Sequence, residues 1–287
     1  MNFNPDKGLA RLEHSKDYIH PAIEHARKAA EDTLTINAVD PHNFIELYGE
    51  ENVNRDLESV ARKEKGFTHD ASKVYAEVLE AVLYDQIELG NWFGQNARTI
   101  KTAPYDDFFN GSDLILELEE ATRTLSHLSL SVDVTFGTTT EEKKFAAIKH
   151  NIDTGTLGKI KYFHSERGGF RGELSKVPQV VIGVEKDTVI KLAGLWAGEQ
   201  GRKKENNAVL GDHPIQRLIM SEILLQLLSF RRYAEDTHKD ALIPIYEKSI
   251  GILEEVLREK GPMDMGDLRN DKVFGAIRES LAVFKTK

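Results

Sequence analysis

The sequence predicts an α/β protein of the mixed α+β kind, with a central mixed sheet flanked by helical regions at both ends of the chain. Apolar residues recur with helical spacing in residues 1–95 and 201–287, whereas residues 96–200 contain short alternating or β-branched runs bounded by turn residues. We therefore expect an N-terminal helical region (1–95) whose last helix packs on the core, an α/β core (96–200) and a C-terminal helical region (201–287). No repeat period or low-complexity linker interrupts this order.

Composition limits the class of protein further. The chain has 287 residues, of which 30% are charged and 40% apolar, as in globular proteins. It contains no run of roughly 18 apolar residues that would cross a membrane and no apolar signal core at its N-terminus. The absence of cysteine excludes disulfides, thiolate zinc sites and cysteine nucleophiles. We expect a cytoplasmic protein without a membrane partner, and a homodimer is left open.

The first region should contain several helices. Pro5-Asp6 can start a helix that runs to about Ala30, with Pro21 bending or interrupting it. Shorter helical patterns follow between Pro41 and Ala61. A stronger pattern begins at Thr68 or Asp70 as the N-cap and ends at Gly90. Glu77 and Glu80 lie in this last helix, away from its apolar arc, so each is interpreted as surface charge.

The centre of the chain predicts a strand over residues 97–102 and then two strands that carry acids. Asn110-Gly111 is a turn signal beside an acidic hairpin at residues 105–107, and polar and apolar residues alternate from Asp113. In the next strand, Ser129, Ser131, Asp133 and Thr135 face away from the leucines and valines. If the strands pair, we expect the carboxylates of Asp113 and Asp133 within about 6 Å, a spacing that suits a hard divalent cation.

The remaining elements follow from caps, periodicity and turn residues. Thr140 should cap a helix whose buried stripe includes Phe145 and Ile148 and which closes at Thr154-Gly155. Further elements are expected as a strand at 159–164, a basic glycine-rich loop at 167–172, a strand at 177–184, and helices at 187–197, 215–234, 240–260 and 267–285.

The order helix, three strands, helix, strand, with acids on the second and third strands, resembles the PD-(D/E)xK nuclease superfamily over about residues 70–200. Asn110-Gly111-Ser112-Asp113 is similar to the first acidic element of that family, and Asp133-Val134-Thr135 stands where the family carries (D/E)-x-K. The chain is also similar to uncharacterised bacterial proteins with Asp-Val-Thr at this point. The resemblance implies a restriction-endonuclease-like core.

The chain departs from the family motif at one position. Thr135 occupies the place of the lysine, and a threonine supplies no cation. Because this lysine can migrate to a neighbouring element, Lys144 is the natural replacement, since it flanks the buried face of the next helix, with Lys143 and Lys149 as weaker candidates. The helical glutamate of the family would be Glu77 or Glu80, and the helical wheel does not choose between them.

The resemblance implies hydrolysis of phosphodiester bonds in DNA or RNA. Asp113, Asp133 and the carbonyl of Val134 would hold Mg²⁺ or Mn²⁺, which would activate water and offset charge on the scissile phosphate. Lys144 would position or deprotonate the water, for which a lysine needs a lowered pKa, and Thr135 would bind water or phosphate. Lys161, Arg167 and Arg171, from a basic stretch that spans residues 143–176, would contact backbone phosphates.

Two other readings stay open. The fold can be a catalytically degenerate nucleic-acid-binding or protein-binding module, which the missing motif lysine favours, or the chain can be a helical interaction protein, which its long helical flanks favour. Other chemistries have less support, because the histidines lack metal-ligand spacing and the chain has no G-x-S-x-G, no P-loop and no G-x-G-x-x-G between a strand and a helix.

Overall fold

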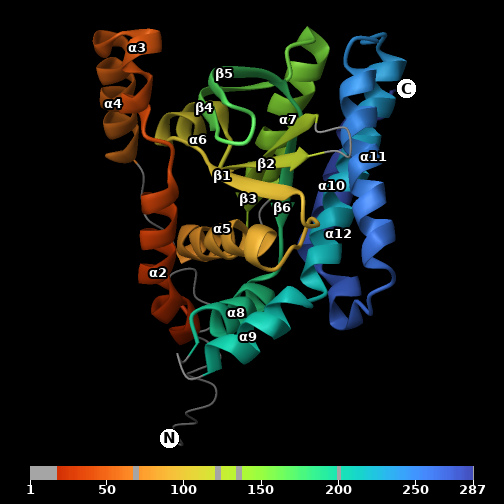
Figure 1. Cartoon of the computed structure of the whole chain (residues 1–287). Helices are drawn as coiled ribbons and strands as arrows, with labels where there is room; N and C mark the ends of the chain where they lie inside the picture. The colour runs from red at the N-terminus through yellow and green to blue at the C-terminus, as the bar shows by residue number, and fades with distance from the viewer. Residues whose placement is uncertain (1–17, 67–70, 120–123, 134–137, 199–201, 287) are drawn as a thin grey trace, which may run out of the picture.

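A computed structural model describes residues 18–66, 71–119, 124–133, 138–198 and 202–286, apart from the side chains of residues 133 and 138–141. Within these ranges the protein is a mixed α/β structure, as the sequence predicted: a four-stranded mixed sheet, a two-stranded sheet, and helices at both ends of the chain (Figure 1).

The main sheet has the strand order β1-β2-β3-β6. β1, β2 and β3 are antiparallel neighbours, whereas β6 runs parallel to β3, from Ser129↔Gln179 to Asp133↔Gly183. β4 and β5 form a separate antiparallel pair. The strands are β1 (Ala97–Lys101), β2 (Leu114–Glu119), β3 (Leu125–Asp133), β4 (Gly158–Ser165), β5 (Phe170–Val177) and β6 (Gln179–Gly183).

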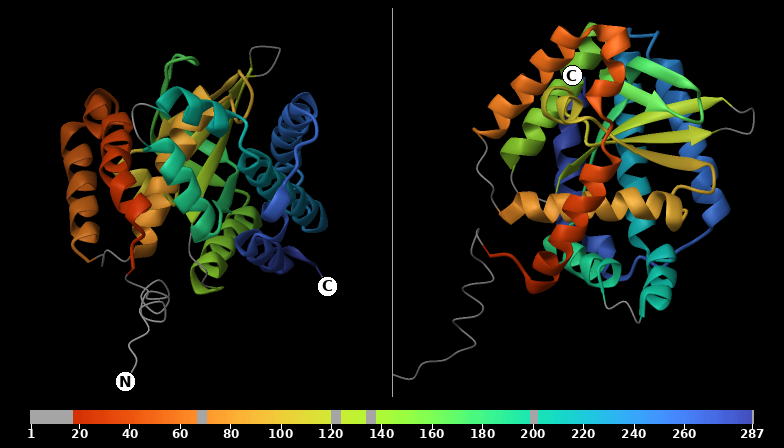
Figure 2. Two further views of the ribbon diagram at one scale, coloured as in Figure 1. Left: turned by 90° about the horizontal axis from the view of Figure 1, so that it is seen from below. Right: turned by 60° about the vertical axis from the view of Figure 1, so that its left-hand side comes forward.

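Helices surround the sheet on several sides (Figure 2). α2 packs against α5 and α8, α5 packs against β1 and β3, and α10 lies along β6 and α11. The helices are α2 (Pro21–Asn37), η1 (Pro41–Phe44), α3 (Ile45–Tyr48), α4 (Glu50–Glu64), α5 (Ala71–Leu89), α6 (Pro104–Asn110), α7 (Thr138–Thr154), α8 (Lys186–Trp196), α9 (Lys203–Gly211), α10 (Ile215–Asp236), α11 (Ile243–Lys260), η3 (Gly266–Asn270), α12 (Lys272–Ser280) and η4 (Leu281–Phe284).

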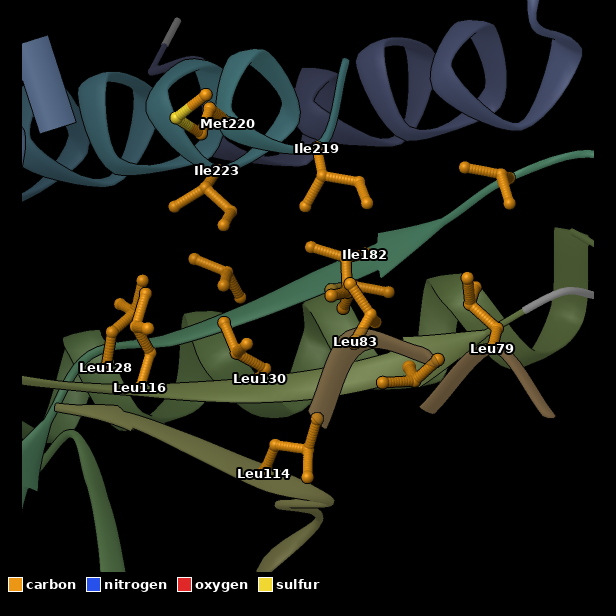
Figure 3. Close-up of a cluster of buried hydrophobic side chains, with 14 of the residues drawn as sticks. Leu79, Leu83, Leu114, Leu116, Leu128, Leu130, Ile182, Ile219, Met220 and Ile223 are labelled. Carbon is orange, nitrogen blue, oxygen red and sulfur yellow. The ribbon is translucent and has the colours of Figure 1, made fainter. Parts of the chain in front are cut away.

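The main hydrophobic core joins α5, the sheet and α10. Leu79 and Leu83 of α5 and Ile219 of α10 meet apolar side chains from β2, β3 and β6 (Figure 3). The same core includes Ile23 near the start of the described chain and Phe284 near its end. The three predicted regions therefore contribute to one core, while their boundaries stay a prediction.

Side chains of α10 form hydrogen bonds with backbone groups along the outer edge of β6. Gln226 accepts a hydrogen bond from the Val181 N–H at 2.8 Å and donates one to the Val181 carbonyl at 2.6 Å. Glu222 accepts from the Gly183 N–H at 3.2 Å. Because both side chains are fully buried, they act here as a neighbouring strand would, and they close this edge of the sheet.

Two predictions about local structure were wrong. The acidic segment Tyr105–Asp107 is not a hairpin but part of α6, which starts at Pro104 and ends at Gly111 in the left-handed conformation (φ +64°). The basic glycine-rich loop is shorter than expected, because Phe170 begins β5, which pairs with β4. Gly168, Gly169 and Gly172 suggested a loop, whereas pairing with β4 imposes an extended backbone from Phe170 on.

The N-terminal helix also differs from the prediction. Residues 18–20 are not helical, and Pro21 stands at the first position of α2, where the missing N–H costs nothing. The Nδ1 of His20 accepts a hydrogen bond from the Ala22 N–H at 3.2 Å. The helix then continues past Ala30 to Asn37. The expected start at Pro5 lies outside the described residues.

None of the helices in the described part of the chain is both long enough and apolar enough to span a bilayer.

Candidate functional site

The candidate site is built around Asp113, which directly precedes β2. Its Oδ2 accepts a hydrogen bond from the Val132 N–H of β3 at 2.6 Å, and its own N–H donates to the Leu130 carbonyl at 3.0 Å. The carboxylate of Asp113 is therefore fixed at the end of β3, one residue before Asp133. Asp113 as a whole residue is half-buried.

Asp133 is the last residue of β3, and its Cα pairs with Gly183. Asp113, directly before β2, and Asp133, at the end of β3, thus lie at adjoining ends of neighbouring strands. The side chain of Asp133 and all of Val134 and Thr135 lie outside the described residues, so the predicted carboxylate distance and the metal-ligand set stay predictions.

A buried ion pair lies beside Asp113. The Nζ of Lys101, at the end of β1, is 2.8 Å from the Glu80 carboxylate of α5, and each side chain is only 9% exposed. The same Nζ lies 3.4 Å from the Asp107 carboxylate of α6 and donates to the Asp113 carbonyl at 3.2 Å. This ammonium group therefore contacts three acidic residues, two through their carboxylates and Asp113 through its backbone carbonyl. We call Glu80, Asp107 and Asp113 the carboxylate cluster.

Electrostatics in the carboxylate cluster disfavour full ionisation. Burial raises the pKa of Glu80 to about 7, although Lys101 opposes that shift. Burial also raises the pKa of Asp113 well above its usual range, and the neighbouring Asp107 and Glu80 raise it further. The carboxylates in turn hold the pKa of Lys101 above its usual value, despite its burial. Like charges gathered around a shared cation give this result.

The structure distinguishes between the two candidate glutamates. Glu80 is buried in the carboxylate cluster, so its interpretation as surface charge was wrong. Glu77 is 36% exposed on its side chain and pairs with Lys73 at 3.7 Å, one turn away on the same helix. Of the two glutamates, Glu80 is therefore the one that lies beside Lys101 and Asp113.

The lysines of α7 also differ in position. Lys144 is half-buried, and its charge lowers the pKa of Asp113, in opposition to burial, which requires that the two groups lie near each other. Lys143 is exposed. Lys149 bonds instead to Asp153 at 3.1 Å and to the hydroxyl of Tyr233. Of the three lysines, Lys144 is therefore the one whose charge acts on Asp113.

The three residues predicted to contact phosphates, Lys161, Arg167 and Arg171, bind other residues of the protein. Lys161 pairs with Asp56, and its Nζ lies 5.1 Å from the ring centre of Tyr105 and 5.4 Å from those of Tyr48 and Tyr162.

The two arginines are bound as well. Arg167 pairs with Glu119 at 2.9 Å, and Arg171 donates to the Asn43 carbonyl at 3.0 Å. A phosphate would have to compete with these partners, most strongly at Lys161, whose side chain is only 21% exposed.

The sequence did not lead us to expect that Lys101, Glu80 and Asp107 lie together. A signal was present for two of them. Glu80 interrupts the apolar run from Val78 to Leu83, and Lys101 continues the inward positions of Ala97 and Thr99 in β1. A charged residue at an apolar position of a helix and another at an inward position of a strand are candidates for a buried pair. Asp107 had no such signal, because its position depends on α6.

Comparison of this chain with known proteins finds no matching family model, no matching curated protein and no matching solved structure. The functional argument therefore rests on the residues and their geometry.

Proposed function

We propose that this chain is a divalent-metal-dependent nuclease that hydrolyses phosphodiester bonds of DNA or RNA. The observation that carries the proposal is the position of Asp113: its carboxylate is bound to the backbone of β3 at Val132, directly before Asp133, and is surrounded by further carboxylates and by Lys144. Acids fixed by rigid backbone at adjoining strands provide the oxygen ligands that Mg²⁺ and Mn²⁺ prefer.

The donor chemistry fits such an ion in part. Among the described side chains, no group of three His, Cys, Asp or Glu residues is arranged to hold a metal. The proposal therefore requires Asp133 and the carbonyl of Val134 as ligands beside Asp113. Burial raises the pKa of Asp113, and repulsion from Asp107 and Glu80 raises it further. The repulsion supports the proposal, because a bound cation would relieve it. When bound, the ion would activate water and offset charge on the phosphate.

The chain's own residues would then divide the remaining work. Lys144, near Asp113, would hold a phosphate oxygen or orient the attacking water. Lys101 would neutralise Glu80 and Asp107, so that Asp113 can lose its proton and serve as a ligand. Thr135 is proposed to bind water or phosphate through its hydroxyl. The proposed partner is nucleic acid and the proposed setting is the cytoplasm.

A second candidate function has its own support. Because Lys101 already supplies a cation to the carboxylate cluster, the fold can be stable without a metal ion, as a non-catalytic binding module would require. The two candidates differ in whether metal binding and turnover occur at all.

The test is cleavage by the purified chain. We expect hydrolysis of single- or double-stranded DNA or RNA with Mg²⁺ or Mn²⁺, loss of activity with EDTA, and loss in Asp113→Asn and Asp133→Ala. Asp240→Asn is the matched control, because Asp240 is exposed beyond the carboxylate cluster. Binding to nucleic acid without turnover in any metal would support the binding module, and no binding of either kind would favour a helical interaction protein.

A further inference from the structure

A cavity of about 680 Å³ adjoins the candidate site. Its wall is formed by α7, the end of α6, β4, β5 and β6, and it includes Ser131 of β3 and Lys144. Since Lys144 also lies near Asp113, the cavity and the carboxylate cluster share this lysine. The volume is within the range of about 300–1,000 Å³ that small-molecule sites occupy, which suits one nucleotide.

The charge of the cavity favours an anionic occupant. Among the described residues that line it are three lysines, Lys144, Lys159 and Lys176, and no aspartate or glutamate. Lys159 is paired with Glu173 at 3.3 Å, whereas Lys176 is exposed. Lys176 also has a left-handed backbone (φ +59°), which is unfavourable for a residue other than glycine. Lys176 is the extra residue of a β-bulge, since Gly158 pairs with Val177 and Lys159 pairs with Ser175.

An aromatic side chain stands at the same cavity. Phe109 of α6 lines it and is 44% exposed, unusual for so large an apolar group. Its ring is held by Tyr105, with ring centres 4.9 Å apart and a tilt of 30°, and by the Lys63 ammonium, 4.5 Å from the ring centre. A rigid, partly exposed ring beside lysines is the combination by which proteins stack the bases of single strands.

The cavity wall also carries two ordered amides. Asn151 donates to Oε1 of Gln179 at 3.1 Å, and Gln179 donates to the Asn110 carbonyl at 2.8 Å. This chain of hydrogen bonds fixes both amides in orientation before any ligand arrives. Fixed amides can bond to the edge of a base, which is exposed only when that base is unpaired.

We propose that this cavity binds one unpaired nucleotide of a single-stranded nucleic acid, with the base on Phe109 and the phosphate beside Lys144 and Lys176. The inference rests on the proposed nuclease function and narrows its substrate to single strands or unpaired ends. A paired nucleotide inside a duplex has its base edge and both faces covered, so it could not enter the cavity unless it were first unpaired.

The experiment measures binding by fluorescence anisotropy in EDTA, without turnover. The probes are a fluorescein-labelled oligothymidylate and a blunt duplex of the same length. We expect the single strand to bind roughly tenfold or more tightly than the duplex. Phe109→Ala and Phe109→Leu should each weaken single-strand binding by roughly fivefold or more, because both remove the flat ring, and the leucine keeps apolar bulk if alanine impairs folding.

Matched controls separate the cavity from general surface effects. Phe170→Ala removes a phenylalanine of equal exposure (45%) that does not line the cavity, and it should leave binding unchanged. Lys176→Gln should weaken binding and reduce its salt dependence by about one released ion, whereas Lys28→Gln, at an exposed lysine of α2, should do neither.

Equal binding of single strand and duplex, or equal effects of Phe109→Ala and Phe170→Ala, would overturn the inference. Cleavage in Mg²⁺ that ignores strandedness would overturn it as well and would leave the nuclease proposal standing. Strand-selective binding that depends on Phe109, without cleavage in any metal, would instead overturn the nuclease proposal and retain the nucleotide site.

Discussion

The Nζ of Lys101 lies 2.8 Å from the carboxylate of Glu80 in the interior of the protein, between the end of β1 and the middle of α5. The same ammonium lies 3.4 Å from the Asp107 carboxylate. The Lys101 ammonium is therefore the counter-ion both of Glu80 in α5 and of Asp107 in α6, the helix that precedes β2. The pair therefore links the scaffold to the candidate site.

Lys101→Met should strongly destabilise the protein. The methionine has a similar length but leaves Glu80 buried without its cation, and breaking a buried pair in this way costs about 3–5 kcal/mol. Denaturant unfolding followed by circular dichroism measures this loss.

Two companion variants make that measurement specific. Lys159→Met removes an exposed pair, with Glu173, and should cost about 0–1 kcal/mol. The double variant Lys101→Met/Glu80→Gln should recover part of the loss, because it removes both charges. A loss of under 1 kcal/mol in Lys101→Met would contradict the role of Lys101 as counter-ion.

Stability should depend on pH through Glu80. Its pKa is raised from 4.5 to about 7 in the folded protein, so the native state binds more protons than the unfolded state between these values. The free energy of unfolding therefore falls as pH rises from about 4.5 to 7. Glu80→Gln should flatten this part of the profile by an amount on the order of 3 kcal/mol.

Urea unfolding at several pH values measures this difference, and Glu77→Gln is the control. Glu77 is more exposed and lies one turn away, so its variant should keep the slope of the unchanged protein. Parallel profiles for Glu80→Gln and the unchanged chain would argue against a raised pKa at Glu80.

Asp133→Ala should change thermal stability differently in the presence and in the absence of metal. Mg²⁺ or Mn²⁺ should raise the melting temperature of the unchanged chain, and Asp133→Ala should abolish that increase. Without metal, Asp133→Ala should leave stability unchanged or raise it, because we expect the Asp133 carboxylate to repel that of Asp113. A purely structural aspartate would show the reverse: lower stability and an unaltered metal response. Differential scanning fluorimetry with and without EDTA distinguishes the two.

Metal affinity should also increase with pH. The pKa of Asp113 is raised well above its usual range, so binding a cation must displace a proton from this carboxyl group. Titration calorimetry with Mn²⁺ in buffers of different ionisation enthalpy should detect proton release. Asp113→Asn removes the titrating proton and the metal ligand together, so both Mn²⁺ binding and proton release should be lost. Proton release that persists in Asp113→Asn would assign the proton to another group.

Gln226→Met should destabilise the sheet at β6. The thioether fills a similar space but can neither donate to the Val181 carbonyl nor accept in a useful way from its N–H, so two buried backbone groups lose their partner. We expect a loss of about 2–4 kcal/mol in denaturant unfolding. Leu228→Ala on the same helix is the control and should cost less, since Leu228 is 37% exposed.

The sequence alone determined the class of fold and most of the elements that form it. Periodicity and turn residues predicted α5, β1, β4, α10 and α11, because apolar spacing is a local property that the chain keeps in any fold that buries it. The single helix expected over residues 267–285 is instead divided into η3, α12 and η4. Alternation also predicted the side of β3 that joins the core, where Leu128 and Leu130 are buried.

The tertiary structure alone decided which charged residues meet. Glu80 and Lys101 are 21 positions apart, and their burial is tolerable only because the packing of α5 on β1 brings opposite charges together. Similarly, Tyr105–Asp107 became helical because Asp106 can then accept hydrogen bonds from the N–H groups of Lys161 and Tyr162, which belong to β4. Local propensity carries no information about such distant partners, and the free energy of burying a charge depends almost entirely on them.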